Sequence, residues 1–87
     1  TTIRNVGAGD FHDLALRTAI DEGKVPGPRM QAAAHSLGIT GGHCDENGWA
    51  PGVNERDWRS GIADSPDQIR AAVRYQVKYG ADVIKTC

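Results

Sequence analysis

The sequence predicts a parallel α/β fold, and three stretches carry that prediction. The chain opens on a β-branched run, contains a well-capped amphipathic helix in its second half, and closes on a continuous apolar run. With the stretches between them, the predicted order is strand, helix, strand, long loop, helix, strand. Two consecutive strand–helix units followed by a strand are typical of parallel sheets.

The first strand and helix are predicted from the N-terminal third of the chain. The stretch TTIRNVG at residues 1–7 is β-branched and ends in a glycine, as a strand before a turn does. Asp10 is a predicted N-cap, and apolar residues at helical spacing extend from Phe11 to Glu22. Gly23 stands where a helix C-terminus favours glycine.

A second strand and a long loop are predicted next. Residues 30–35, within GPRMQAAAHSLGI, are short, apolar and flanked by turn residues, which favours a buried strand over a helix. The stretch from Gly38 to Gly61 is loop-like and holds six of the eleven glycines. Loops of this length inside compact domains are uncommon and are usually either functional or disordered.

The best-defined helix is predicted over residues 65–80. Ser65 is the expected N-cap, Pro66 occupies the first helical position, and Gln68 completes a capping box. The expected apolar stripe consists of Ile69, Ala72, Val73 and Val77. After Gly80, the stretch ADVIK at residues 81–85 has the unbroken apolar centre of a strand that is buried on both faces.

Three parallel strands and two helices make a poor free-standing domain. Both outer strands would be open edges, and a chain of 87 residues buries a modest core. The chain also starts within the first predicted strand and stops just after the last one, with no linker at either end. Residues 1–87 are therefore expected to be part of a larger α/β domain.

Composition argues against several classes of partner. The chain is 39% hydrophobic and 24% charged, with a net charge of −1 and both signs interspersed. This balance gives no electrostatic reason to expect binding to nucleic acid or to an anionic membrane. No apolar run approaches the roughly 20 residues that a bilayer-spanning helix needs.

The two cysteines are expected to be free thiols, with a single bridge between them as the alternative. A disulfide scaffold of this size usually carries four or more cysteines, and this chain has Cys44 and Cys87 alone. Free thiols favour a reducing compartment such as the cytoplasm. A targeting segment could precede the first residue, so the location is left open.

Lys85 and His43 are the candidate functional residues. Lys85 ends an apolar strand, at the edge where parallel sheets place their active sites. An apolar setting favours a neutral, nucleophilic amine, although a lysine that extends its charge into solvent fits the position equally well. His43 follows two glycines in TGGHCD and is expected at the same edge. A histidine of a solvated surface loop is its simpler interpretation.

The other candidates carry weaker signals. His35 lies in an apolar run and is expected to be a hydrogen-bonded core residue, whereas His12 is expected to be solvated. Arg4 and Asn5 could face the same edge as Lys85. The stretch GAGD lacks the third glycine of a dinucleotide-binding motif, and the cysteine and histidine spacing matches no zinc site.

Four blocks in this order resemble the amidohydrolase superfamily: TTIRNVG, ALRTAIDEGKVPGPR, LGITGGHCD and SPDQIRAAVRYQVKYGADVIK. The most similar group comprises imidazolonepropionase-like proteins and prolidase-like carboxypeptidases. The resemblance covers essentially all 87 residues, and PGPR, TGGH and GADVIK carry it together. It implies that the chain supplies strands two, three and four of a (β/α)8 barrel, with the two helices between them.

The resemblance also implies a site and a reaction. Lys85 matches the strand-four lysine that is carboxylated and bridges two divalent metal ions, for which zinc is expected. His43 matches a histidine that contacts the substrate near the scissile carbonyl group. The remaining ligands of that site would lie outside these residues, on strands one, five, six and eight. Family members commonly have aspartate after the arginine of strand two, where this chain has Asn5, so no role is assigned to that residue.

The implied function is hydrolysis of an amide bond, in a dipeptide or N-acyl amino acid, by a metal-activated hydroxide. Two alternatives remain open: a cyclic-amide hydrolase of the imidazolonepropionase type, and a non-catalytic α/β module that binds a ligand through GAGD or TGGH. A small molecule or dipeptide is the expected partner, and a homo-oligomer is compatible with the sequence.

Overall fold

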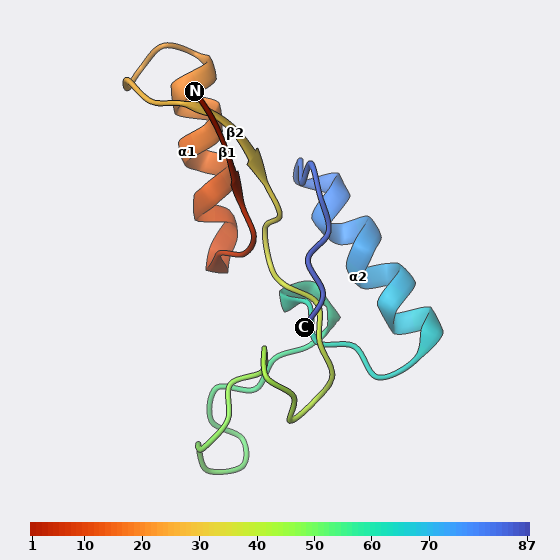
Figure 1. Cartoon of the computed structure of the whole chain (residues 1–87). Helices are drawn as coiled ribbons and strands as arrows, with labels where there is room; N and C mark the ends of the chain where they lie inside the picture. The colour runs from red at the N-terminus through yellow and green to blue at the C-terminus, as the bar shows by residue number, and fades with distance from the viewer.

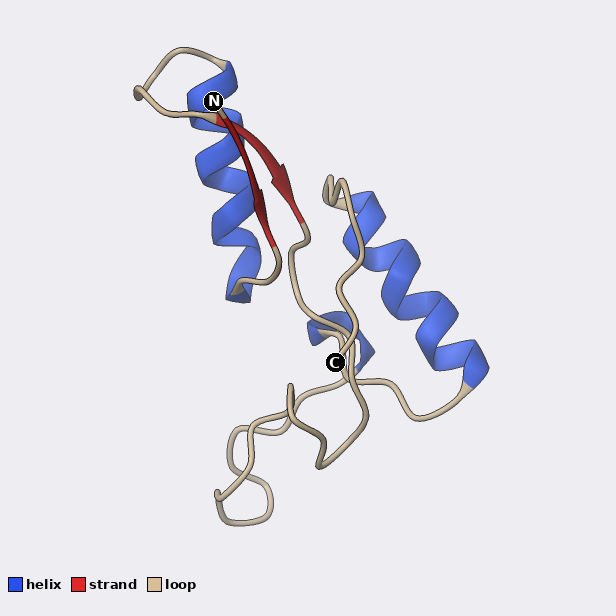
Figure 2. Ribbon diagram, in the orientation of Figure 1, coloured by secondary structure: helices blue, strands red, loops and turns tan.

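The computed structural model describes all residues from 1 to 87 and has a two-stranded parallel sheet with one helix beside it and a second helix further along the chain (Figures 1 and 2). Strands β1 (Thr2–Asn5) and β2 (Arg29–Ala32) pair from Thr2 opposite Arg29 to Asn5 opposite Ala32. The helical elements are η1 (Gly9–Phe11), α1 (His12–Asp21), η2 (Trp58–Ser60) and α2 (Pro66–Lys78). The predicted α/β class is confirmed at this level.

The third predicted strand, at residues 81–85, does not form a regular strand. Ala34 has a φ of 61°, which turns the chain out of the extended conformation soon after β2 ends at Ala32. The C-terminal segment therefore meets this stretch at separate points. Asp82 N–H donates to the Ala32 carbonyl at 2.8 Å, and a parallel bridge joins Leu37 to Thr86. The same turn explains why β2 is shorter than the predicted strand over residues 30–35.

Helix α1 begins without the predicted cap. Asp10 has a φ of 52°, a left-handed conformation, and the cap position is occupied by Phe11, which gives no side-chain hydrogen bond. The buried carboxylate of Asp13 has the organising role instead. It accepts hydrogen bonds from the backbone N–H groups of Leu14 and Ala34, at 2.9 Å each. Asp13 thus joins the start of α1 to the chain beyond β2.

Helix α2 begins as predicted, with Ser65 Oγ accepting from Gln68 N–H at 3.2 Å. The return bond of the capping box is displaced by one residue, because Gln68 Oε1 accepts from Asp64 N–H at 2.7 Å. The predicted apolar stripe is partly wrong. Ala72 is fully buried, but Ile69 and Val77 are 46% and 57% exposed.

The core is small and built largely from alanine. One cluster contains Leu14, Ala32 and Ala34, packed against Phe11 and Ala81. The other contains Leu37, Ala63 and Ala72, packed against Trp58 and Val73. Several larger apolar side chains, including Leu16, Ile69 and Val77, stay about half exposed. Neither helix of the chain combines the length and the apolar character needed to cross a membrane.

Candidate active site

The carboxyl ends of both strands face the side of the molecule where the long loop and the C-terminus lie (Figure 2). The chain leaves β1 at Asn5 and β2 at Ala32 toward this side. The C-terminal segment reaches it as well, because Leu37 N–H donates to the carbonyl of Lys85 at 2.8 Å. Active sites of parallel α/β folds lie at this edge, where segments from separate strands meet.

Lys85 is half-buried at this edge. Its Nζ donates to the carbonyl of Thr86 at 2.9 Å, and no carboxylate forms a salt bridge with it. The preceding Ile84 is 39% exposed, so the apolar setting that the sequence predicts around the lysine is only partly formed by these residues. The side-chain nitrogen of Lys85 therefore makes one hydrogen bond, to a backbone carbonyl, and no other polar contact within the chain.

His43 is exposed, and no hydrogen bond engages its imidazole. It follows a turn in which Gly42 N–H donates to the Ile39 carbonyl at 3.0 Å. Gly41, with a φ of 75°, donates its N–H to Asp45 at 2.8 Å. A side chain at this φ is strained, which accounts for a glycine in TGGH. The turn leaves the imidazole free to contact a ligand.

The start of this loop is fixed to the beginning of α2. Asp64 accepts hydrogen bonds from the Thr40 hydroxyl at 2.6 Å and from the Thr40 N–H at 2.9 Å. The hydroxyl bond, followed by the N–H bond, lowers the pKa of the Asp64 carboxyl below its ordinary value. Because a carboxylate accepts both bonds, the ionised form holds the loop more strongly than the protonated form.

Cys44 and Cys87 form a disulfide, with their Cα atoms 6.1 Å apart. The prediction of two free thiols is therefore wrong. The two cysteines are 43 residues apart in sequence, and only the pairing of Leu37 with Thr86 brings their segments together. The disulfide joins the residue after His43 to the residue two positions after Lys85.

His35 is a buried structural histidine, as the sequence predicts. Its Nε2 accepts from Asp10 N–H at 3.2 Å, which leaves Nδ1 to donate to Gln76 Oε1 at 3.1 Å. Gln76 was missed by the sequence analysis, although it follows buried Ala72 by four residues on the same helix face. Its Oε1 also accepts from His35 N–H, and its Nε2 donates to the Arg59 carbonyl.

The side chains of Arg4 and Asn5 make hydrogen bonds within the fold. Asn5 Nδ2 donates to Asp13 at 3.2 Å and to the Gly7 carbonyl at 3.3 Å. Arg4 donates to Gln31 on the neighbouring strand at 3.2 Å. His12 is exposed, as expected.

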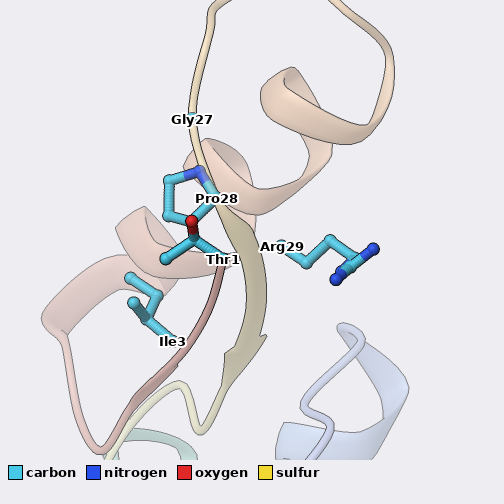
Figure 3. A pocket seen from close by; sticks show the side chains of 5 residues that line it. All are labelled: Thr1, Ile3, Gly27, Pro28 and Arg29. Atoms are coloured by element: carbon cyan, nitrogen blue, oxygen red, sulfur yellow. The ribbon is translucent and has the colours of Figure 1, made fainter.

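Two hollows lie at opposite ends of the sheet. At the N-terminal ends of the strands, a hollow of about 500 Å³ is lined by Thr1, Ile3, Gly27, Pro28 and Arg29. Figure 3 shows Ile3 on one side of the strands and Arg29 extending to the other. Beyond the carboxyl ends, a hollow of about 190 Å³ is lined by Ala8, Gly9, His35, Ser36, Cys44, Arg56 and Ser60. The second hollow lies beside the disulfide, and neither His43 nor Lys85 lines it.

A metal ion could take only part of its ligands from these residues. No group of three or more histidine, cysteine, aspartate or glutamate side chains is placed to hold one. The cysteines are joined to each other, and His35 uses both ring nitrogens in hydrogen bonds. Lys85 and His43 take part in no salt bridge, and the imidazole of His43 makes no hydrogen bond.

Comparisons with known proteins relate this chain to hydrolases. No family model matches it. Ochratoxinase from Aspergillus niger is 33% identical over an alignment 97 residues long, gaps included, that covers 91% of this chain and 20% of that protein. A crystal structure of a Xaa-Pro dipeptidase with bound methionine in its active site aligns with a TM-score of 0.89 and 42% identity, over 99% of this chain and 22% of that one. A crystal structure of an amidohydrolase aligns with a TM-score of 0.72 and 33% identity, with the same coverage of each chain.

These similarities confirm the resemblance to the amidohydrolase superfamily. They extend over essentially the whole chain. The sequence identities of 33% to 42% and the two structural alignments point to the same group of proteins. The chain spans about a fifth of the length of the relatives it matches.

Proposed function

We propose that residues 1–87 form strands two to four of a (β/α)8 barrel in a metal-dependent hydrolase that cleaves the amide bond of a dipeptide or N-acyl amino acid. The position of Lys85 carries this proposal. The lysine lies at the carboxyl edge of the sheet, tied to Leu37 by a backbone hydrogen bond of 2.8 Å. The 42% identity to a Xaa-Pro dipeptidase supports the substrate class.

Lys85 would act as a ligand after carboxylation. Its neutral Nζ adds to the carbon of carbon dioxide, a proton leaves the nitrogen, and a carbamate results whose two oxygens share one negative charge. In this structure Nζ donates to one backbone carbonyl and forms no salt bridge with a carboxylate, so no ion pair would have to break before carboxylation. Two divalent metal ions, bound by the carbamate and by ligands outside this chain, would supply Lewis acidity and an activated hydroxide.

His43 would act on the substrate. Its imidazole is exposed and makes no hydrogen bond within the chain, so a ring N–H is available to donate to the carbonyl oxygen of the scissile bond. A donor placed where negative charge develops stabilises the transition state more than the ground state. The turn at Gly41 and the Thr40–Asp64 hydrogen bonds would hold this donor in place.

The proposal is tested with the complete protein that carries this chain. Purified protein loaded with zinc is assayed against a dipeptide library, a set of N-acyl amino acids and a cyclic amide such as imidazolonepropionate. Hydrolysis of dipeptides or N-acyl amino acids is expected. Cleavage of the cyclic amide alone would replace the proposed substrate class. Absence of both activities and of stoichiometric metal would reject the enzyme proposal.

A substitution tests the role of His43 in the same assay. His43→Asn is expected to lower kcat/KM by about 100-fold or more while metal content stays unchanged, as loss of a transition-state donor does. His12→Asn is the matched control, because His12 is also exposed but is the first residue of α1 and lies outside the loop that carries His43. Loss of metal in the His43 variant would make this residue a ligand instead.

A further inference from the structure

We propose that the Cys44–Cys87 disulfide is a positioning device that holds the His43 loop against the segment of Lys85. The inference rests on the proposed function and assigns these two cysteines to the same site. The bond joins the immediate neighbour of His43 to the residue two positions beyond Lys85, across a Cα–Cα distance of 6.1 Å.

Backbone hydrogen bonds to Leu37, independent of the disulfide, hold the C-terminal segment beside the chain that follows β2. Its N–H donates to the Lys85 carbonyl at 2.8 Å, and its carbonyl accepts from Cys87 N–H at 2.9 Å. Side chains alternate along an extended segment, so residues 85 and 87 are expected on the same face. The disulfide therefore lies on the face that carries the lysine.

Gly38 is an independent sign that the backbone accommodates this bond. A Cβ atom added to Gly38 would lie 3.3 Å from the Cβ of Cys44 and 3.9 Å from the Cβ of Cys87. Because Gly38 has no side chain, both cysteines can pack closely against the backbone that connects β2 to the loop. Gly38 N–H also donates to the Gly61 carbonyl at 2.9 Å, so this point of the backbone is fixed.

Few other contacts hold the part of the loop that contains His43. The Thr40–Asp64 bonds hold the start of the turn, and Gly41 binds Asp45 within the loop itself. None of these connects residues 43 and 44 to the C-terminal segment. Without the disulfide, the imidazole would keep its turn, but residues 43 and 44 would lose their covalent link to the segment that carries Lys85. An enzyme whose donor moves in this way loses rate, because a small misplacement weakens transition-state contacts.

The test uses the complete metal-loaded protein in oxidised and reduced form. Dithiothreitol reduces the bond in two exchanges. One of its thiolates attacks the sulfur of one cysteine, which forms a mixed disulfide and releases the other cysteine as a thiolate. The second thiol of the reagent then closes a ring and releases the cysteine held in the mixed disulfide, so that dithiothreitol is oxidised and both cysteines are reduced. Alkylation followed by mass measurement counts the thiols. Untreated protein is expected to show Cys44 and Cys87 unmodified by alkylation, and reduced protein to show both modified. Free thiols in untreated protein purified under oxidising conditions would overturn the proposal.

Activity then separates positioning from general stability. Reduction, and the Cys44→Ser and Cys87→Ser variants, are expected to lower kcat by roughly 10-fold with metal content unchanged. The double variant Cys44→Ser/Cys87→Ser should no longer respond to dithiothreitol. In a His43→Asn background, reduction should cost no further activity, because the group that the bond positions is already gone. A full additional loss in that background would overturn the positioning role.

Hydrogen exchange measures the effect of the disulfide on the loop without relying on enzymatic activity, so its result does not depend on the proposed function. Reduction is expected to increase exchange at residues 40–45 and to leave α1, at residues 12–21, unchanged. If the protein hydrolyses no amide, the proposed function fails, and the exchange result alone decides the positioning role. Unchanged exchange at residues 40–45 after complete reduction would overturn it.

Discussion

Lys85 is hydrogen-bonded through its carbonyl to the backbone N–H of Leu37, five residues beyond the end of β2. This bond places the lysine at the carboxyl edge of the sheet even though residues 81–85 form no regular strand. The position of this segment at the edge therefore depends on separate contacts with Ala32 and Leu37 rather than on a continuous ladder.

Lys85→Ala is the first test of this position. In the complete protein, the variant is expected to lose most of its metal and to fall at least about 100-fold in activity, as loss of a supporting ligand does. Short carboxylic acids added to this variant should restore part of both, since they can supply the missing anionic oxygens. Lys85→Arg should not be rescued, because its bulk and fixed charge remain in the site.

Lys24→Ala is the matched control for that experiment. Its side chain is 71% exposed and pairs only with Glu22 in a surface turn. Metal content and activity should equal those of the unmodified protein. A mass or an electron-density map of the metal-loaded enzyme that shows an unmodified Lys85, with both metals bound, would contradict the ligand role.

Local signals in the sequence were sufficient where an element depends on its own residues. The Ser65 cap and the proline after it act within one turn, and α2 begins there as predicted. The buried state of His35 also followed from its apolar neighbours. These features need no knowledge of distant contacts.

Features that depend on distant contacts could not be predicted in the same way. Asp10 resembles an N-cap, but its N–H is drawn to His35, 25 residues away, and Asp13 takes the organising role through Ala34. The disulfide needs the C-terminal segment beside Leu37. Each depends on a contact between residues far apart in sequence, which propensity and periodicity do not encode.

Gln76 is expected to be essential to stability despite its distance from the proposed chemistry. Gln76→Leu removes the acceptor of His35 N–H and the donor to the Arg59 carbonyl, inside a fully buried position. The same change also removes the acceptor of His35 Nδ1. Leaving a buried polar group unpaired costs about 1–3 kcal/mol, so the two groups of His35 alone predict a loss of about 2–6 kcal/mol in unfolding free energy. Urea denaturation of the complete protein measures it. Gln31→Leu, at an exposed strand position, should change stability by less than about 0.5 kcal/mol.

Asp82 should make the C-terminal segment sensitive to acid. Burial raises the pKa of its carboxyl, but the Ala32 N–H and the Arg17 guanidinium outweigh that effect, so the pKa lies below its ordinary value of 3.8. A lowered pKa stabilises the fold above pH 3.8 and loses that contribution as the pH falls through the folded-state pKa. Asp82→Asn should therefore lower stability by about 1 kcal/mol near neutral pH, after solvent screening, and much less once the pH has fallen below the folded-state pKa.

Thermal unfolding at several pH values measures the Asp82 effect. Asp67→Asn is the control, because that carboxylate is 94% exposed and pairs only with Arg70 on the same helix. A difference between the two variants that is the same at every pH would contradict a contribution from ionised Asp82.

The isolated chain of 87 residues is expected not to fold as a cooperative monomer. Its core is mainly alanine, while Leu16 on α1 and Ile69 and Val77 on α2 are about half exposed. These side chains can gain burial only against further chain or against other copies. Expressed alone, the chain should form oligomers or a state that binds a hydrophobic dye and melts over a broad temperature range. A monomer with a sharp thermal transition and well-dispersed amide signals would contradict this expectation, and with it the proposal that residues 1–87 are part of a larger barrel.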